Sequence, residues 1–439
     1  MESRSDYTLE SVLLQSERLE KDVELNEVTT DVDIYEHLDK PYLTGQVTII
    51  DNNRIYEQAD LLGGERITIK IKSKRKETKT ITNYFYIKKI VFDEKSGDNV
   101  QVLSFHLIED TAFISNLINI NKAYSGKASD IISKISKEYL DTELFVNGED
   151  KQNVKVIVPN LNPIETIKWL TQRATTVRGY PFYCFSTLAF NRLNFVDLGT
   201  MLEAPVINPI IPYRYSRVIN NSTDEDERRR VIKAYRMTGN AEDLASMIKK
   251  GLIGAKYKFI DTYKDEQAEG NFNIVTDLAK NIIEDELLKG QPNLNYSIAY
   301  KHNEKSFDDF QSRTISTVRS SGAYKDHEVD AEASQVKTYG EAVELADYKL
   351  EVISRAMDNL LKKSVLSIVV PGLDFIDGDK HSTISNQIRV EFQNSDPFFG
   401  KDLDKKKSGN YLIYGVRHQF KKEKYDAILT LVKMGNMRR

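Results

Sequence analysis

The first hundred or so residues alternate between apolar and polar positions. Residues 66–72 place an isoleucine at every second position with threonine or lysine between, and residues 43–49 repeat this period. A period of two predicts strands with one buried face. Residues 80–92 form a longer aromatic segment that turns at residues 96–98 into residues 100–108, which predicts a hairpin.

The pattern then becomes helical. A helix start is predicted at Asn162, which is a favoured capping residue. Pro163 would occupy the first helical position and Glu165 the third, where each residue type is common. Ser129 is the predicted cap of an earlier helix. The apolar positions of the two helices are Ile131, Ile132, Ile135 and Tyr139, and Ile164, Ile167, Leu170 and Ala174. Strands are predicted over residues 181–187 and 192–197, so this part is expected to be a small α/β unit.

A mixed, more charged region follows. Asn240 and Gly251 bracket a short predicted helix, residues 272–288 have a helical pattern, and residues 340–363 predict a long helix. Alternation returns after residue 383. Strands are predicted over residues 384–392, 412–420 and 425–432, the last two joined by a turn at residues 421–424. The two strand-rich ends predict two related β-barrels separated by α/β material.

Composition narrows the classes of function. The 439 residues suggest about three domains, and the net charge of −4 lacks the basic excess typical of a DNA-binding protein. We expect no signal peptide, because residues 1–6 contain no apolar core, and no membrane helix, because no apolar run is long enough. The protein is therefore expected to be made in a cytoplasm and to remain soluble there.

The residue types that carry chemistry are scattered. The six histidines include no pair at metal-binding spacing, and His106 and His418 lie in predicted strands, where a packed or hydrogen-bonded role is favoured. Cys184, the only cysteine, lies in an aromatic run and is interpreted as a buried apolar residue. Gly63-Gly64 fits a tight turn better than a phosphate loop, and Asp374–Asp379 fits a turn better than a calcium loop. We therefore predict no catalytic, cofactor-binding or metal-binding residues and no enzyme activity.

Three parts of the sequence resemble the central baseplate hub proteins of T-even-type contractile phages. They lie in the first strand region, around the Asn162 helix, and near the C-terminus: residues 40–52 with 64–70, residues 124–132 with 158–170 and 180–183, and residues 370–372 with 408–418 and Tyr425. The order and spacing of these segments match the first barrel, the middle domain and the closing strands of such hubs.

The resemblance implies a β-rich α+β fold with two tail-tube-like antiparallel barrels, an α/β domain and helical insertions. The implied organisation is a first barrel in residues 1–112, an α/β middle domain in 113–212, a mixed region contributing to the barrels and an insertion in 213–365, and strands completing the second barrel in 366–439. No cofactor is implied.

The resemblance also implies a structural role in a virion. Such hubs form trimers whose six barrels match the sixfold tail tube, while threefold symmetry matches the spike. The expected partners are two further chains, the spike, the tube or its initiator, the tape-measure protein and baseplate wedge proteins. DNA would pass through the channel without specific binding, consistent with a net-negative chain. The expected location is the tail baseplate, assembled in the host cytoplasm.

Two other functions remain open from the sequence. The chain could be the hub of a phage-derived contractile injection or secretion apparatus, which would share the fold. A tail-associated cell-wall hydrolase would instead need a pocket with two positioned carboxylates. Arg75-Lys76 and Lys405–Lys407 are candidate interface loops, and the basic run Lys74–Lys76 is a candidate contact for nucleic acid. A solvated loop is the favoured interpretation of each.

Overall fold

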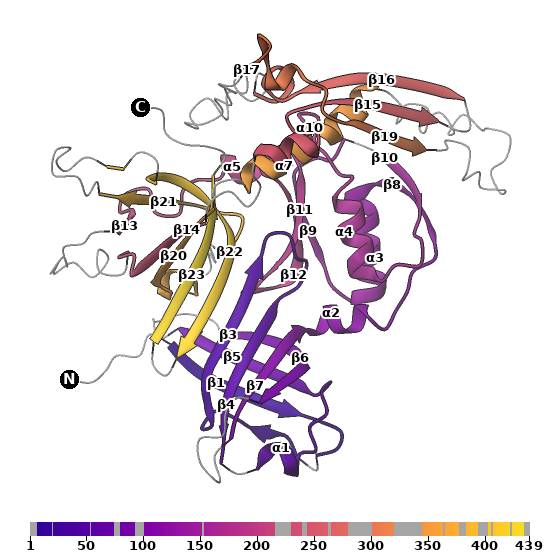
Figure 1. The fold of residues 1–439 in the computed structure, drawn as a ribbon. Helices are drawn as coiled ribbons and strands as arrows, with labels where there is room; N and C mark the ends of the chain where they lie inside the picture. The colour runs from indigo at the N-terminus through magenta and orange to yellow at the C-terminus, as the bar shows by residue number, and fades with distance from the viewer. Residues whose placement is uncertain are drawn as a thin grey trace.

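The structure is a computed structural model of the chain, and strands dominate it (Figure 1). The residues that it describes are 7–19, 21–52, 54–73, 80–92, 101–151, 153–215, 230–238, 244–261, 265–279, 301–319, 345–362, 365–376, 383–393, 403–404, 407–421 and 424–433. Within those ranges no helix is both long enough and apolar enough to cross a membrane. The β-rich α+β fold predicted from the sequence is confirmed.

Seven strands near the N-terminus form the first barrel. They are β1 (Tyr7–Gln15), β2 (Val23–Glu24), β3 (Thr29–His37), β4 (Thr44–Asp51), β5 (Arg66–Ser73), β6 (Ile81–Phe92) and β7 (Gln101–Glu109). Their order in the sheet is β2-β1-β5-β6-β7-β4-β3, so β2 and β3 lie at its two ends. Only four residues connect β2 to β3, and such a link can span only about 17 Å. The sheet therefore curls and brings β2 and β3 near each other.

The predicted alternation produces the core of this barrel. Along β4 every second residue is buried, including Val47 and Ile49, and the three isoleucines of β5 are also buried. Each fully buried side chain of this size contributes about 1.5–3 kcal/mol. The predicted hairpin is confirmed, because β6 and β7 pair in antiparallel register.

Six strands form the second barrel: β13 (Tyr213–Tyr215), β14 (Ala234–Thr238), β20 (Val365–Pro371), β21 (Gln387–Phe392), β22 (Gly409–Lys421) and β23 (Lys424–Val432). Hydrogen bonding runs β14-β20-β23-β22-β21-β13. Arg214 of β13 then bonds to the segment that enters β14: its N–H donates to Arg230 O, and its carbonyl accepts from Ile232 N, each at 2.9 Å. These two bonds complete the circuit of strands.

Strand β22 belongs to both barrels. On one edge its first residues, Gly409 to Leu412, pair with β21, and residues 415–421 pair with β3. Its other edge pairs with β23 across the predicted turn. At the tip of this hairpin, Phe420 and Tyr425 pack into the core of the first barrel. The two barrels are thus continuous through one strand.

The α/β unit lies beside the barrels, with α3 and α4 between the β9, β11 and β12 strands on one side and the β8–β10 pair on the other (Figure 1). Its elements are α2 (Asp110–Ser115), β8 (Ala123–Lys127), α3 (Ala128–Leu140), β9 (Leu144–Asn147), β10 (Asn153–Ile157), α4 (Pro163–Thr171), β11 (Phe182–Thr187), β12 (Phe190–Asp197) and α5 (Leu198–Glu203). The predicted cap of α4 is confirmed, since Asn162 Oδ1 accepts from Glu165 N at 2.8 Å. The predicted cap at Ser129 is wrong: α3 begins at Ala128, and the Ser129 hydroxyl donates to Asp150.

A second small sheet, β16-β15-β19, is inserted between β14 and β20 and lies at the top of Figure 1. The inserted elements are α7 (Leu244–Lys249), β15 (Gly254–Asp261), β16 (Glu266–Asn273), the π-helix η1 (Ile274–Ala279), β17 (Lys301–His302), β18 (Lys305–Ser306), η2 (Phe307–Asp309), β19 (Thr314–Arg319) and α10 (Leu345–Leu361). Buried aromatic residues of β15 and β16 belong to the same core as α10, which occupies part of the long helix predicted there.

Two helices predicted in the insertion differ from or only partly match the structure. The helix predicted over residues 272–288 is wrong at its start, because Phe272 and Asn273 end strand β16 and only the short π-helix follows. Residues 280–300 lie outside the described residues. Gly251 ends α7 as predicted, with φ of 74° and its N–H bonded to Ile248 O, whereas the predicted cap Asn240 lies outside the described residues.

Candidate functional site

An ion pair joins the two barrels where β3 meets β22. Arg417 of β22 donates to both carboxylate oxygens of Asp33 at 3.0 and 2.9 Å. The Asp33 side chain is 7% exposed and that of Arg417 is 37% exposed. The hydrogen bond with Asp33 is the main reason that the pKa of Arg417 is raised. Two parallel bonds fix orientation as well as distance, so the pair favours one register between the barrels.

A buried polar network lies beside this ion pair and reaches the α/β unit. His418 Nδ1 and Tyr425 Oη are 2.7 Å apart, and His418 Nε2 lies 3.4 Å from Glu36. Glu36 Oε1 also accepts from Leu188 N, in the turn between β11 and β12, at 2.5 Å. The structural role predicted for His418 is confirmed. The network links both barrels to the α/β unit at one point.

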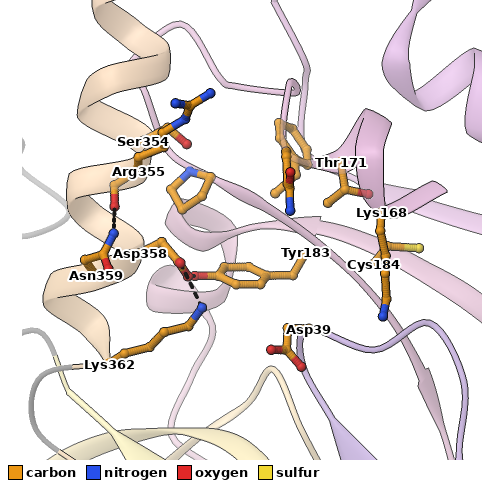
Figure 2. Close-up of a pocket in the computed structure, with 13 residues that line it drawn as sticks. Asp39, Lys168, Thr171, Tyr183, Cys184, Ser354, Arg355, Asp358, Asn359 and Lys362 are labelled. Atoms are coloured by element: carbon orange, nitrogen blue, oxygen red, sulfur yellow. Dashed lines mark hydrogen bonds and ion pairs between the residues drawn. The ribbon is translucent and has the colours of Figure 1, made fainter. Parts of the chain in front are cut away.

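A cleft of about 510 Å³ opens where the α/β unit, the insertion and the first barrel meet (Figure 2). Helix α4 forms one wall, the end of α10 forms the opposite wall, and β11 forms the floor. Asp39, which follows β3, contributes from the first barrel. This volume falls in the range of protein sites for small ligands or short chain segments.

The wall formed by α10 carries an acid whose charge is compensated. Asp358 accepts a hydrogen bond from the Tyr183 hydroxyl at 2.7 Å and pairs with Lys362 at 2.8 Å. Burial of Tyr183, followed by the charge of Asp358, raises the pKa of the Tyr183 hydroxyl well above its usual value. The hydroxyl therefore remains a proton donor to Asp358.

The second acid of the cleft, Asp39, pairs with His37. Burial raises the pKa of Asp39, but the hydrogen bond with His37 and the charges of His37 and Lys362 outweigh burial, so its pKa is lowered. General-acid catalysis of glycoside hydrolysis requires a carboxyl group with a raised pKa. Asp39 shows the opposite shift, which disfavours it as the proton donor of a hydrolase.

The two remaining cations have no acidic partner among the described residues. Lys168 of α4 is half-buried, with its Nζ 5.5 Å from the centre of the Tyr42 ring. Arg355 of α10 is exposed at the rim on the opposite wall (Figure 2). Sequence reasoning missed both residues. Each is an ordinary polar position on an amphipathic helix, and they are far apart in the chain.

The predicted burial of Cys184 is confirmed, since it is 4% exposed where it lines the cleft. Burial raises the pKa of its thiol to about 12. The reactive form of a cysteine is the thiolate, which is scarce at neutral pH when the pKa is this high. The residues that line the cleft also include no histidine to act as a base for this thiol.

Gly63-Gly64 forms the predicted tight turn, with φ values of 95° and 88° and the Gly63 N–H donating to Glu65 at 3.0 Å. Asp374 lies in the short helix η4 (Leu373–Phe375) and accepts from the Tyr213 hydroxyl at 3.2 Å. Residues 377–379 of the same motif lie outside the described residues. Asp374 therefore has a hydrogen-bonding partner within the fold.

The other residues noted in the sequence are dispersed. His106 is exposed on β7, opposite Gln46, so a packed role for this histidine is wrong. Lys407 is half-buried and pairs with Asp404 at 3.2 Å, so this member of the second basic run is not a free surface cation. The run Lys74–Lys76 lies outside the described residues, as do the first two residues of Lys405–Lys407. Across the described ranges, no three metal-binding side chains are grouped to hold an ion.

The chain matches no protein-family model and no curated protein. Its structure is similar to the 43 kDa tail protein of prophage MuSo2 from Shewanella oneidensis, with 11% sequence identity and a TM-score of 0.50, covering 97% of this chain and 98% of that one. A tail protein from Neisseria meningitidis MC58 aligns at 12% identity and a TM-score of 0.48, covering 98% and 97% of the two chains. An E. coli component of the type VI secretion system aligns at 9% sequence identity and a TM-score of 0.42, covering 97% of this chain and 79% of that one.

At 11% identity, the likeness to the prophage protein establishes a shared fold over nearly the whole of both chains. The fold is therefore one that a prophage tail protein also adopts.

Proposed function

We propose that this protein is a structural subunit of a phage-type tail and, more specifically, the central hub of a contractile baseplate. The observation that carries the proposal is the fusion of two β-barrels through the shared strand β22. A trimer of such chains would present six barrels. It could therefore match a sixfold tube on one side and a threefold spike on the other.

The fold adds support, because a prophage tail protein shares it from end to end. The proposed organisation is the one expected from the sequence, with barrel strands in residues 1–112 and 366–439, the α/β domain in 113–212 and the mixed region in 213–365. The rigid joint between the barrels also suits a ring under mechanical load, since Arg417 and Asp33 fix its register.

The proposed partners follow from this position. Two further copies of the chain would complete the ring, the tube or its initiator would bind one side, and the spike would bind the other. Tape-measure and wedge proteins would contact the inside and outside. DNA would pass without specific binding, since a net charge of −4 gives no general attraction for phosphates. The ring would be assembled in the host cytoplasm and reside in the virion baseplate.

The hub of a phage-derived injection or secretion apparatus is the alternative within the same architecture. We propose no enzymatic role, because the cleft residues Asp39 and Cys184 have pKa shifts opposite to those that acid or thiol catalysis requires.

Light scattering on a size-exclusion column tests the proposal. A mass near three times the chain mass of 50.4 kDa is expected for the chain alone, or three chains plus the mass of the spike after addition of the spike protein of the same tail. A strict monomer under both conditions would contradict the hub assignment. Peptidoglycan zymography tests the hydrolase alternative, and lysis that disappears in Asp39→Asn or Asp358→Asn would favour it.

A further inference from the structure

The cleft between α4 and α10 has a defined balance of charge. Of the charged side chains that line it, Lys168, Arg355 and Lys362 are cations, and Asp39 and Asp358 are acids. Asp358 is bonded to Tyr183 and Lys362, and Asp39 is paired with His37, whereas Lys168 and Arg355 have no acidic partner among the described residues. The cleft therefore presents an excess of positive charge although the whole chain is negative.

The position of the two cations limits what they can bind. They project from helices on opposite walls, so one compact anion is not enclosed by several converging donors (Figure 2). A half-buried lysine without a counter-ion bears a desolvation cost that an entering carboxylate would offset. The geometry thus suits an extended ligand that carries carboxylates at separate points.

The rest of the lining suits a peptide. The floor is formed by aromatic residues of β11, including Phe182, which can pack against side chains of low polarity. Gln172 and Asn359 stand on the two walls. The Asn359 amide nitrogen already donates one hydrogen bond to Arg355 O at 2.7 Å, which leaves its second N–H and its side-chain carbonyl oxygen for a peptide backbone. A volume of about 510 Å³ admits only a short segment.

We propose that the cleft binds a short acidic segment of a neighbouring assembly protein. Carboxylates of that segment would pair with Lys168 and Arg355, and its backbone would bond to Gln172 and Asn359. The inference rests on the proposed function, because it takes the occupant to be another subunit of the tail. It adds that this subunit inserts an acidic loop or tail at the place where the insertion, the α/β unit and the first barrel meet.

Fluorescence anisotropy on the full chain tests the inference with a dye-labelled tetraglutamate peptide as the probe and tetraglutamine as its neutral control. We expect saturable binding of tetraglutamate alone. In the variant Lys168→Gln/Arg355→Gln, binding should weaken by about tenfold, the effect of losing two partly exposed ion pairs. The matched control is Lys134→Gln/Lys137→Gln, which removes two cations from the exposed face of α3 and should bind as the wild type does.

Three results would overturn the inference: no saturable binding of tetraglutamate, equal loss of binding in the α3 control, or displacement of the peptide by an equal concentration of inorganic phosphate. The single variant Arg355→Gln changes only an exposed side chain and should still weaken binding measurably, so a folding defect in the double variant leaves the test intact. The mass of each preparation separates this inference from the proposed function. A trimer that binds no acidic peptide contradicts only the inference, whereas a chain that remains monomeric both alone and with the spike protein contradicts the hub assignment.

Discussion

Arg417 and Asp33 form the one doubly hydrogen-bonded ion pair described between the two barrels, at the point where β22 leaves its pairing with β21 and continues along β3. Its strength depends on burial of the acid. Because Asp33 is nearly enclosed, it cannot regain full hydration when its partner is removed.

Replacing Arg417 with alanine should lower the free energy of unfolding by about 1–3 kcal/mol, since Asp33 would lose its only ion-pair partner among the described residues and keep only the side-chain bond from Gln419 at 3.3 Å. Urea denaturation measures the change. Lys421→Ala is the control, because its pair with Asp31 spans 3.6 Å between more exposed side chains and should contribute less than about 0.5 kcal/mol. Equal losses in the two variants would mean that the Arg417 pair does not stabilise the joint.

Glu109 should make stability depend on pH. It is buried at the end of β7 and accepts from Leu43 N at 2.7 Å, and burial raises its pKa from 4.5 to about 7. The folded state therefore holds a proton that the unfolded state releases above pH 4.5, so stability falls as pH rises from about 4.5 to 7. The upper bound of this loss is about 3 kcal/mol.

The variant Glu109→Gln removes this titration while keeping an acceptor for Leu43. Its stability, measured by urea denaturation between pH 5 and pH 8, should fall less with rising pH than that of the wild type. Parallel curves for the two proteins would show that Glu109 does not titrate with a raised pKa.

Asn162 should be required for the stability of α4, the helix that carries Lys168. Its side chain accepts from Glu165 N at 2.8 Å and from the Ser115 hydroxyl at 3.1 Å. Asn162→Ala should cost about 1 kcal/mol, as for other helix caps, whereas Asn162→Asp keeps the acceptor and should cost less. Thermal denaturation followed by circular dichroism would distinguish the two, and identical melting temperatures would argue against the cap.

Cys184 should be almost inert in the folded protein. Its thiol is buried and has a pKa of about 12, so the thiolate that attacks disulfide reagents is scarce at pH 8. Ellman's reagent should react slowly with the native chain and release one equivalent of thiolate dye rapidly in guanidinium chloride. Rapid reaction of the native chain would mean that the floor of the cleft opens readily.

The sequence predicts well those helices and strands that have one buried face and one exposed face. β5 and β23 alternate because one face of each strand packs in a barrel core, and the Asn162 helix has a complete set of end signals. Strand β16 was not predicted, because Phe272 is its one large apolar residue. The apolar residues that follow Phe272 are spaced as in a helix. The sequence pattern therefore predicts a helix or strand only when buried apolar residues recur along it at the regular spacing of that element.

The cleft could not be predicted in the same way. Its lining comes from Asp39, from the α4 to β11 region and from the end of α10, which are brought together only by tertiary packing. Lys168 and Arg355 have no unusual local context, and their lack of acidic partners among the described residues is visible only in three dimensions.

Negative-stain electron microscopy of the purified chain, alone and mixed with the spike protein of the same tail, tests the proposed hub. We expect threefold rings with an open centre, each ring containing six barrel-sized densities contributed by three chains. Single particles without a ring in both samples would contradict it.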